Sequence, residues 1–173
     1  MTTDVLSAIA LPATLRGRDL PPFIGDFYRA YSQRDAGLLD AILDDDVEWL
    51  LNGPADQFDM YGHRRGKAEV IELVTRILPC FFRIIDFEIE HLLLQGERVA
   101  IYGRLRARQR DTGRSLCFRA VHFLRFRNGK LIAFHGLGDT FDAAQQVVGH
   151  PIDVHTRIDP VALVPEEDAL LSL

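Results

Sequence analysis

Arginine recurs between apolar residues in the second half of the chain. Arg104 and Arg106 are two positions apart, as residues on one face of a strand are, and Tyr102 has the same spacing from Arg104. A guanidinium group holds carboxylate or enolate oxygens through paired hydrogen bonds. Together with Arg119 and Arg125, these residues predict a pocket that holds an anion. The alternative is that Arg104 pairs with a structural carboxylate while Arg106 and Arg125 lie in water.

Three side chains could transfer protons. His91 has a ring that accepts or donates a proton near neutral pH, and Tyr102 carries a hydroxyl on the neighbouring predicted strand. Asp139 follows the last predicted strand and could act as an acid or a base. The catalytic candidates are therefore His91, Tyr102 and Asp139, with no reaction assigned to them. The alternative for His91 is a structural histidine whose hydrogen bonds are satisfied within the fold.

A further group of polar residues falls on the opposite predicted sheet face. Glu88, His122 and His135 form one row there, with the two histidines on adjacent strands about 5 Å apart, a spacing that permits a shared metal ion. We prefer a hydrogen-bonded cluster at a subunit contact, so no metal and no cofactor is predicted. Cys80 and Cys117 have no histidine beside them in the predicted register, which argues against a thiolate nucleophile.

These residues would be positioned by a four-stranded meander. Beyond Phe82 the apolar residues change from a period of about 3.6 to a period of about 2. Turns at Gln95-Gly96, Thr112-Gly113 and Asn128-Gly129 separate strands that we predict at 83–94, 97–110, 114–127 and 130–138. The first half predicts helices at about 20–31, 35–43 and 67–79, with a strand at 47–51. A closing helix is expected at 141–148.

The turns determine the expected register of the sheet. Two-residue loops would pair Leu94 with Glu97, Asp111 with Arg114, and Arg127 with Lys130. With the strand at 47–51, this register places the ligand-binding candidates on one inner face. They are Trp49, Phe87, Ile89, His91, Tyr102, Arg104, Arg119, Val121, Phe123 and Phe134. The outer face is also partly apolar, so we expect a second subunit to cover much of it in a homodimer.

Composition limits the class of protein. The chain has 173 residues, of which 47% are hydrophobic and 26% charged, and its net charge is −5. These values suit one folded domain and argue against a nucleic-acid partner. No apolar run reaches the roughly 20 residues of a membrane-spanning helix, and the N-terminus does not resemble a signal peptide. With only two cysteines, we expect a cytoplasmic location.

The order of the elements resembles the nuclear transport factor 2-like superfamily, in its SnoaL-like and ketosteroid isomerase-like branch. The resemblance is carried by Gly66 before the third helix, Gly96-Glu97-Arg98-Val99, the stretch from Arg125 to Lys130, and Asp139. It implies an α+β cone, usually dimeric, in which a curved antiparallel sheet packs on three helices. That sheet would consist of the four-stranded meander plus a short N-terminal strand or hairpin. We expect an N-terminal extension at 1–19, a SnoaL-like domain at 20–149, and a tail at 150–173 that packs on its own or the partner subunit.

The resemblance allows the chemistry of related enzymes to be tested on this chain. Steroid isomerases use a base, a tyrosine and a protonated aspartate. The matching positions fall near Trp49, Phe27 and Val121, none of which can move a proton. A shift of one residue would bring Tyr28 into play, but no base. Related dehydratases use inward histidines and tyrosines, and related cyclases use an acid or base near the last strand, which is where Asp139 falls.

The sequence therefore predicts a protein that binds a small apolar or aromatic molecule with a carboxylate or carbonyl end. If the protein is an enzyme, isomerase, cyclase or dehydratase chemistry on a carbonyl compound fits best. The alternative is a catalytically inactive ligand-binding or dimeric interaction module, which the loss of the three steroid-isomerase positions favours. An acid–base pair inside the pocket would support the enzyme.

Overall fold

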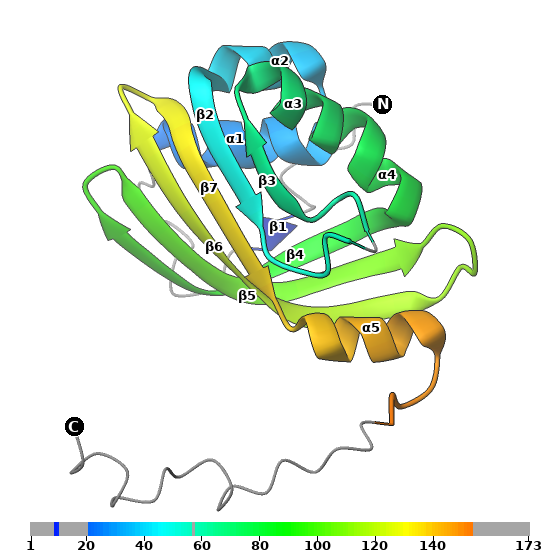
Figure 1. Cartoon of the computed structure of the whole chain (residues 1–173). Helices are drawn as coiled ribbons and strands as arrows, with labels where there is room; N and C mark the ends of the chain where they lie inside the picture. Colours follow the sequence, from blue (N-terminus) through cyan, green and yellow to red (C-terminus); the bar gives the residue numbers. More distant parts are fainter. Residues whose placement is uncertain (1–8, 11–20, 57, 154–173) are drawn as a thin grey trace, which may run out of the picture.

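The computed structural model describes residues 9–10, 21–56 and 58–153, which form a curved sheet with helices over one face (Figure 1). The strand order is β1-β4-β5-β6-β7-β2-β3. The strands are β1 (Ile9–Ala10), β2 (Leu43–Leu51), β3 (Gly62–Arg65), β4 (Phe82–Gln95), β5 (Arg98–Gln109), β6 (Ser115–Arg127) and β7 (Lys130–Gly138). Two pairs are parallel, β1 with β4 and β2 with β7, and the remaining pairs are antiparallel. The predicted tail beyond residue 153 lies outside the described residues.

The α+β cone fold and its meander are confirmed. Strands β4 to β7 match the four predicted strands to within one or two residues at each end. Asn128 and Gly129 have φ of 53° and 77°, as the predicted turn requires, and Arg127 pairs with Lys130 as expected. The strand predicted at 47–51 lies within β2. It pairs with β3 as a hairpin on one side and with β7 on the other.

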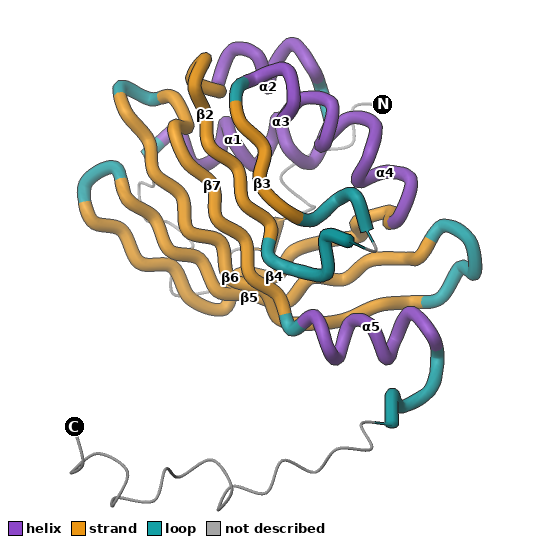
Figure 2. The backbone as a smooth tube through the Cα atoms, in the orientation of Figure 1, coloured by secondary structure: helices purple, strands orange, loops and turns teal. Residues whose placement is uncertain are grey.

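The helices are α1 (Pro22–Gln33), α2 (Ala36–Ile42), α3 (Lys67–Glu72), α4 (Leu78–Phe81) and α5 (Thr140–Val148). α1 begins at a proline and ends where Arg34 adopts a left-handed φ of 54°. The Asp35 carboxylate then accepts the Leu38 N–H at the start of α2. Figures 1 and 2 show α1 to α4 together on one side of the sheet, while α5 continues from the end of β7.

The helix predicted at 67–79 is interrupted by a π-helical turn. In this turn, Leu73–Ile77, the Leu78 N–H bonds to the Leu73 carbonyl five residues earlier. Pro79 has no N–H with which to continue α-helical bonding back to Thr75. Val74 and Leu78, four residues apart at this turn, both line the cavity described below. π-turns of this kind are frequent at functional sites.

The predicted inner face of the sheet is wrong, in part because two strands contain bulges. The β4–β5 register shifts between Ile89 and His91, and the β6–β7 register shifts so that Ile132 has no partner. A one-residue shift turns the following side chains to the other face. As a result, Ile89 and Phe134 are buried on the helix side, while His91 pairs with Tyr102 on the face away from the helices.

The two faces of β5 and β6 are exchanged relative to the prediction. Tyr102 pairs with Val121 and Arg104 with Arg119, and these side chains point away from the helices together with Phe123. The rows expected to be outer form the core instead, and include Val99, Ile101, Leu124, Phe126 and Leu131. The Phe23 ring of α1 packs on Phe126 with ring centroids 4.5 Å apart. Burying the apolar rows is favourable, whereas buried guanidinium groups would need charged partners.

The arginines on the exposed face pair with carboxylates. Arg104 Nη2 lies 3.0 Å from Glu90 Oε1, and Arg106 Nε lies 2.8 Å from Asp86 Oδ1. Arg119 Nε lies 3.7 Å from the other oxygen of Glu90. Pairing with a structural acid is the alternative that the sequence left open for Arg104. Exposed ion pairs of this kind contribute about 1 kcal/mol or less to stability.

Candidate functional site

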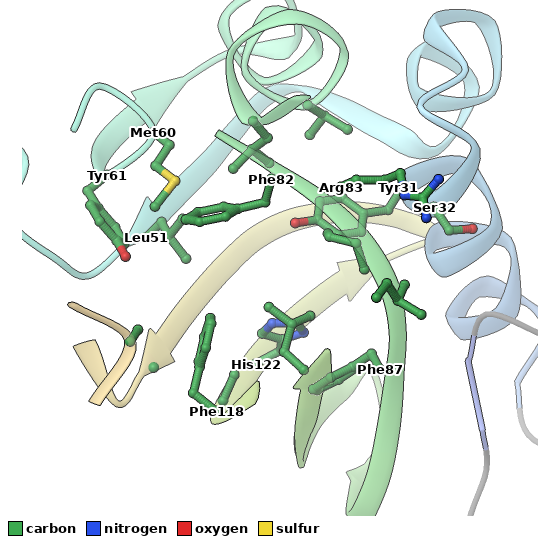
Figure 3. A pocket seen from close by; sticks show the side chains of 18 of the residues that line it. Tyr31, Ser32, Leu51, Met60, Tyr61, Phe82, Arg83, Phe87, Phe118 and His122 are labelled. Carbon is green, nitrogen blue, oxygen red and sulfur yellow. The ribbon is translucent and has the colours of Figure 1, made fainter. Parts of the chain in front are cut away.

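A cavity of about 450 Å³ lies between the helices and the sheet. Figure 3 shows Tyr31, Ser32 and Arg83 at one end, Met60 and Tyr61 at the other, and His122 with Phe118 on the sheet side. Most of its wall is apolar: Leu51, Met60, Val74, Leu78, Phe82, Ile84, Ile85, Phe87, Leu105, Phe118, Ala120, Leu137 and Ala143. Among the described lining residues there are arginines, tyrosines and a histidine but no carboxylate. The cavity is therefore apolar with an excess of positive charge.

A tyrosine and a histidine meet on the cavity wall. The Tyr28 hydroxyl lies 2.9 Å from His122 Nδ1, and the two residues are only 4% and 8% exposed. The rings of Phe87 and Phe134 flank the imidazole, with centroids 4.8 Å and 5.0 Å away. Burial in these surroundings lowers the pKa of His122 to about 4 and raises the pKa of Tyr28 well above its usual range. Both groups are therefore neutral at pH 7, and a hydrogen bond joins them.

The local sequence explains how this pair is positioned. Phe27 is fully buried in the core, while Tyr28, one helical step further on, reaches the cavity. His122 lies opposite Gly136 of β7. A Cβ at Gly136 would come within 2.8 Å of the Phe134 ring, so the glycine permits that ring to lie against the imidazole.

Three arginines line the same cavity. The Arg34 side chain donates to the Phe82 carbonyl at 3.2 Å, and Arg110 Nε donates to the Pro79 carbonyl at 3.0 Å. Both guanidinium groups therefore lie at the junction of α4 and β4, next to Arg83 at the start of β4. Burial and the nearby charge of Arg110 lower the pKa of Arg34. Within the described part of the chain, no carboxylate forms an ion pair with any of the three.

The sequence-derived ligand-binding candidates divide into two groups. Phe87 lines the cavity, and Trp49, Ile89 and Phe134 are buried in the core beside it. The Trp49 indole stacks on Phe134 at 3.7 Å, and its N–H has no partner in the described structure. The remaining candidates point away from the helices and do not line this cavity: His91, Tyr102, Arg104, Arg119, Val121 and Phe123.

Two of the predicted catalytic candidates, Asp139 and His91, make contacts outside the cavity. The Asp139 carboxylate accepts the Asp142 N–H and so caps α5. His91 is exposed, and its ring stacks on Tyr102 with centroids 5.8 Å apart. Neither residue lines the cavity.

The predicted row of Glu88, His122 and His135 does not form. The bulge in β7 places His135 on the exposed face, where its Nε2 lies 3.2 Å from Asn52 Oδ1, while His122 points into the cavity. Across the described ranges, no group of three or more potential metal ligands occurs.

Sequence reasoning missed His122 as a pocket residue and reached Tyr28 only through a one-residue shift. A usable signal existed in β5 and β6. Val99, Ile101, Leu105 and Ala107 alternate with arginines and a tyrosine, and this pattern favours the apolar side as the buried one. The His122 side chain falls on that side. Arg34 and Arg110 have no such signal, because both lie at the ends of elements.

Comparison with known proteins identifies the family. The profile of the SnoaL-like domain matches residues 24–134, and the chain belongs to this family. A candidate isomerase from Rhodopseudomonas palustris has a similar structure, with 29% identity, a TM-score of 0.67, and coverage of 87% of this chain and 100% of that one. An NTF2-like protein of unknown function from Burkholderia pseudomallei is 28% identical, with a TM-score of 0.62 over 69% of this chain and 89% of its own.

A more distant likeness adds to the assignment of the fold. TerC, co-crystallised with polyporic acid, is 20% identical, with a TM-score of 0.62 over 74% of this chain and 99% of its own. No curated protein matches the chain. None of the described helices is long and apolar enough to cross a membrane.

Proposed function

We propose that the chain binds a small apolar carbonyl compound in the cavity and moves a proton on it. The cavity volume of about 450 Å³ is typical of small-molecule pockets, which combine apolar walls with a few polar groups. The similarity to a candidate isomerase, and to a protein of this fold crystallised with a small organic acid, supports the proposal. The observation that carries it is the buried Tyr28–His122 pair on the cavity wall.

The pair has the two groups that enolisation needs. If Nδ1 of neutral His122 donates to the Tyr28 oxygen, Nε2 is free to accept a proton from the carbon beside a carbonyl. The Tyr28 hydroxyl is then free to donate to the carbonyl oxygen. The C–H bond breaks, an N–H bond forms, and the electron pair moves onto oxygen as an enolate. Return of the proton to another carbon completes an isomerisation. If the enolate instead expels a β-hydroxyl group, the proton leaves with that group as water, which completes a dehydration.

His122 is a weak base, because burial lowers its pKa to about 4. A steroid-isomerase carboxylate of about the same basicity, with a pKa near 4.6, removes a proton beside a ketone because the enolate is stabilised. In this protein the Tyr28 hydroxyl and the positive charge of the cavity would stabilise the enolate. Since the imidazole is already neutral at pH 7, the reaction rate should not change between about pH 6 and pH 9.

The experiment follows deuterium exchange into 2-tetralone by NMR in D₂O. This apolar bicyclic ketone has acidic protons beside its carbonyl and is smaller than the cavity. We expect the protein to accelerate exchange, and Tyr28→Phe and His122→Gln each to remove roughly 100-fold of the acceleration. Tyr102→Phe and His91→Gln, which change the other tyrosine–histidine pair, are matched controls that should keep it. If only these two control variants lost the exchange, the catalytic site would lie on the exposed sheet face instead of in the cavity.

A second candidate function is a ligand-binding module without catalysis. The observation in its favour is that no carboxylate lines the described cavity, so His122 is the single base available there. The same experiment separates the two functions. Tight binding of 2-naphthol, the aromatic relative of the tetralone enol, with no exchange into 2-tetralone in the native protein would support the module.

We also propose a homodimer that forms through the sheet face away from the helices. That face exposes Leu93 (72%) and Phe123 (50%) beside the rows of paired charges. Sedimentation should give twice the chain mass of 19.6 kDa, and Phe123→Asp should return the protein to a monomer. A native monomer at micromolar concentration would refute this.

A cytoplasmic location fits with Cys80 and Cys117, both of which are unpaired and exposed.

A further inference from the structure

We infer that the ligand carries an anionic group, most simply a carboxylate, which Arg34 and Arg110 hold at the junction of α4 and β4. This inference rests on the proposed small-molecule binding and adds the chemical class of the ligand. The two guanidinium groups are anchored at carbonyls only three residues apart, Phe82 and Pro79, so they converge on the same part of the cavity wall.

The charge at this place is not balanced within the described protein. Arg83 adds a third positive charge from the start of β4. No carboxylate lines the described cavity, and none of the described acids forms an ion pair with these arginines. On the exposed sheet face, by contrast, Arg104 and Arg106 each have a carboxylate partner at 3.0 Å or less. Arg34 is half-buried, while Arg83 and Arg110 are exposed at the cavity edge. A half-buried guanidinium group without a counter-charge, next to two further positive charges, is a favourable site for an anion.

A structural role accounts for part of this arrangement. The carbonyls of Pro79 and Phe82 lie at the C-terminal end of α4, where arginine side chains commonly bond the last free carbonyls. Each guanidinium group, however, has five N–H donors, and a single side-chain bond is present for each within the described residues. The donors that remain can form paired hydrogen bonds to one carboxylate.

The test compares two ligands of the same shape, 2-naphthoate and 2-naphthamide, by calorimetric titration of the full chain at pH 7.5. Hydrogen bonds to charged groups contribute about 1.5–3 kcal/mol, which corresponds to a roughly 10- to 100-fold preference for the carboxylate. Arg34→Asn removes one guanidinium group while tolerating the left-handed backbone, and Arg110→Gln removes the other. Arg108→Gln, at an exposed arginine that does not line the cavity, is the matched control.

We expect the preference for naphthoate to fall at least fivefold in each cavity variant and to be unchanged in the control. Equal binding of the two ligands by the native protein would overturn the anion inference but leave the cavity's function standing. A preference that persists in both cavity variants, with only their stability reduced, would show that these arginines are helix-capping residues. Failure of the native protein to bind either ligand would overturn the proposed function together with the inference.

Discussion

Acidification should destabilise this protein through His122. The imidazole is buried, and burial lowers its pKa in the folded chain to about 4, whereas an unfolded chain restores the ordinary value of about 6.5. Between these values the unfolded state binds a proton that the folded state excludes. The free energy of unfolding therefore rises with pH in this range, and its His122 contribution is fully present above about pH 6.5.

The size of the effect follows from the two pKa values. Each tenfold difference in proton affinity corresponds to about 1.4 kcal/mol, so the complete loss below pH 4 is about 3 kcal/mol. Between pH 7.5 and pH 5 the expected loss is about 2 kcal/mol. That amount is a large fraction of the stability of an ordinary domain, about 5–15 kcal/mol.

The assay is urea unfolding of the native protein and of His122→Gln between pH 7.5 and pH 5. Glutamine does not titrate, and its amide N–H can still donate a hydrogen bond to the Tyr28 oxygen. Because both proteins share every other titrating group, the difference between their pH dependences isolates His122. A loss of free energy of unfolding between pH 7.5 and pH 5 that is the same in the two proteins, to within about 0.5 kcal/mol, would refute the reasoning. An NMR titration that gives His122 a pKa above 6 would refute it as well.

Three further predictions concern stability. Tyr28→Phe leaves a buried imidazole nitrogen without its partner, so urea unfolding should show a free energy of unfolding lower by about 1–2 kcal/mol. An unchanged free energy would contradict the buried hydrogen bond. Gly103→Ala would place a Cβ 2.4 Å from the Glu88 carbonyl oxygen, so we expect a lower thermal unfolding midpoint, equivalent to about 1–3 kcal/mol. An unchanged midpoint would mean that β4 and β5 can move apart without cost. The Gln146 side chain accepts a hydrogen bond from the Cys117 N–H at 2.7 Å and donates one to the Cys117 carbonyl at 2.8 Å. Gln146→Ala should therefore speed hydrogen exchange of the Cys117 amide. Unchanged protection of this amide would show that α5 is held against β6 in another way.

Much of the fold could be predicted because its signals are local. The turn at Asn128-Gly129 needs positive φ at both residues, and the strands around it follow from a period of two. Gly149 marks the end of α5 through its left-handed backbone, which depends only on neighbouring residues. Such features lie within a few residues of their cause.

The candidate site could be predicted only in part. A bulge adds one residue without leaving a clear mark in the composition, and the bulges near Glu90 and Ile132 reverse which residues share a face. Once the face was misassigned, Tyr102 and His91 became candidates, whereas the residues that line the cavity are Tyr28 and His122. The catalytic roles predicted for His91, Tyr102 and Asp139 stay predictions, and the Tyr28–His122 pair comes from the structure alone.

By itself, the sequence determined the α+β class, the meander, the order of the elements and the family resemblance, because hydrophobic periodicity and turn chemistry act over short distances. Only the tertiary structure decided which sheet face the helices cover, and with it that His122 is buried against Tyr28 while Arg104 pairs with Glu90 on the opposite face. That choice depends on the summed burial of side chains from all four meander strands, and no single segment contains it.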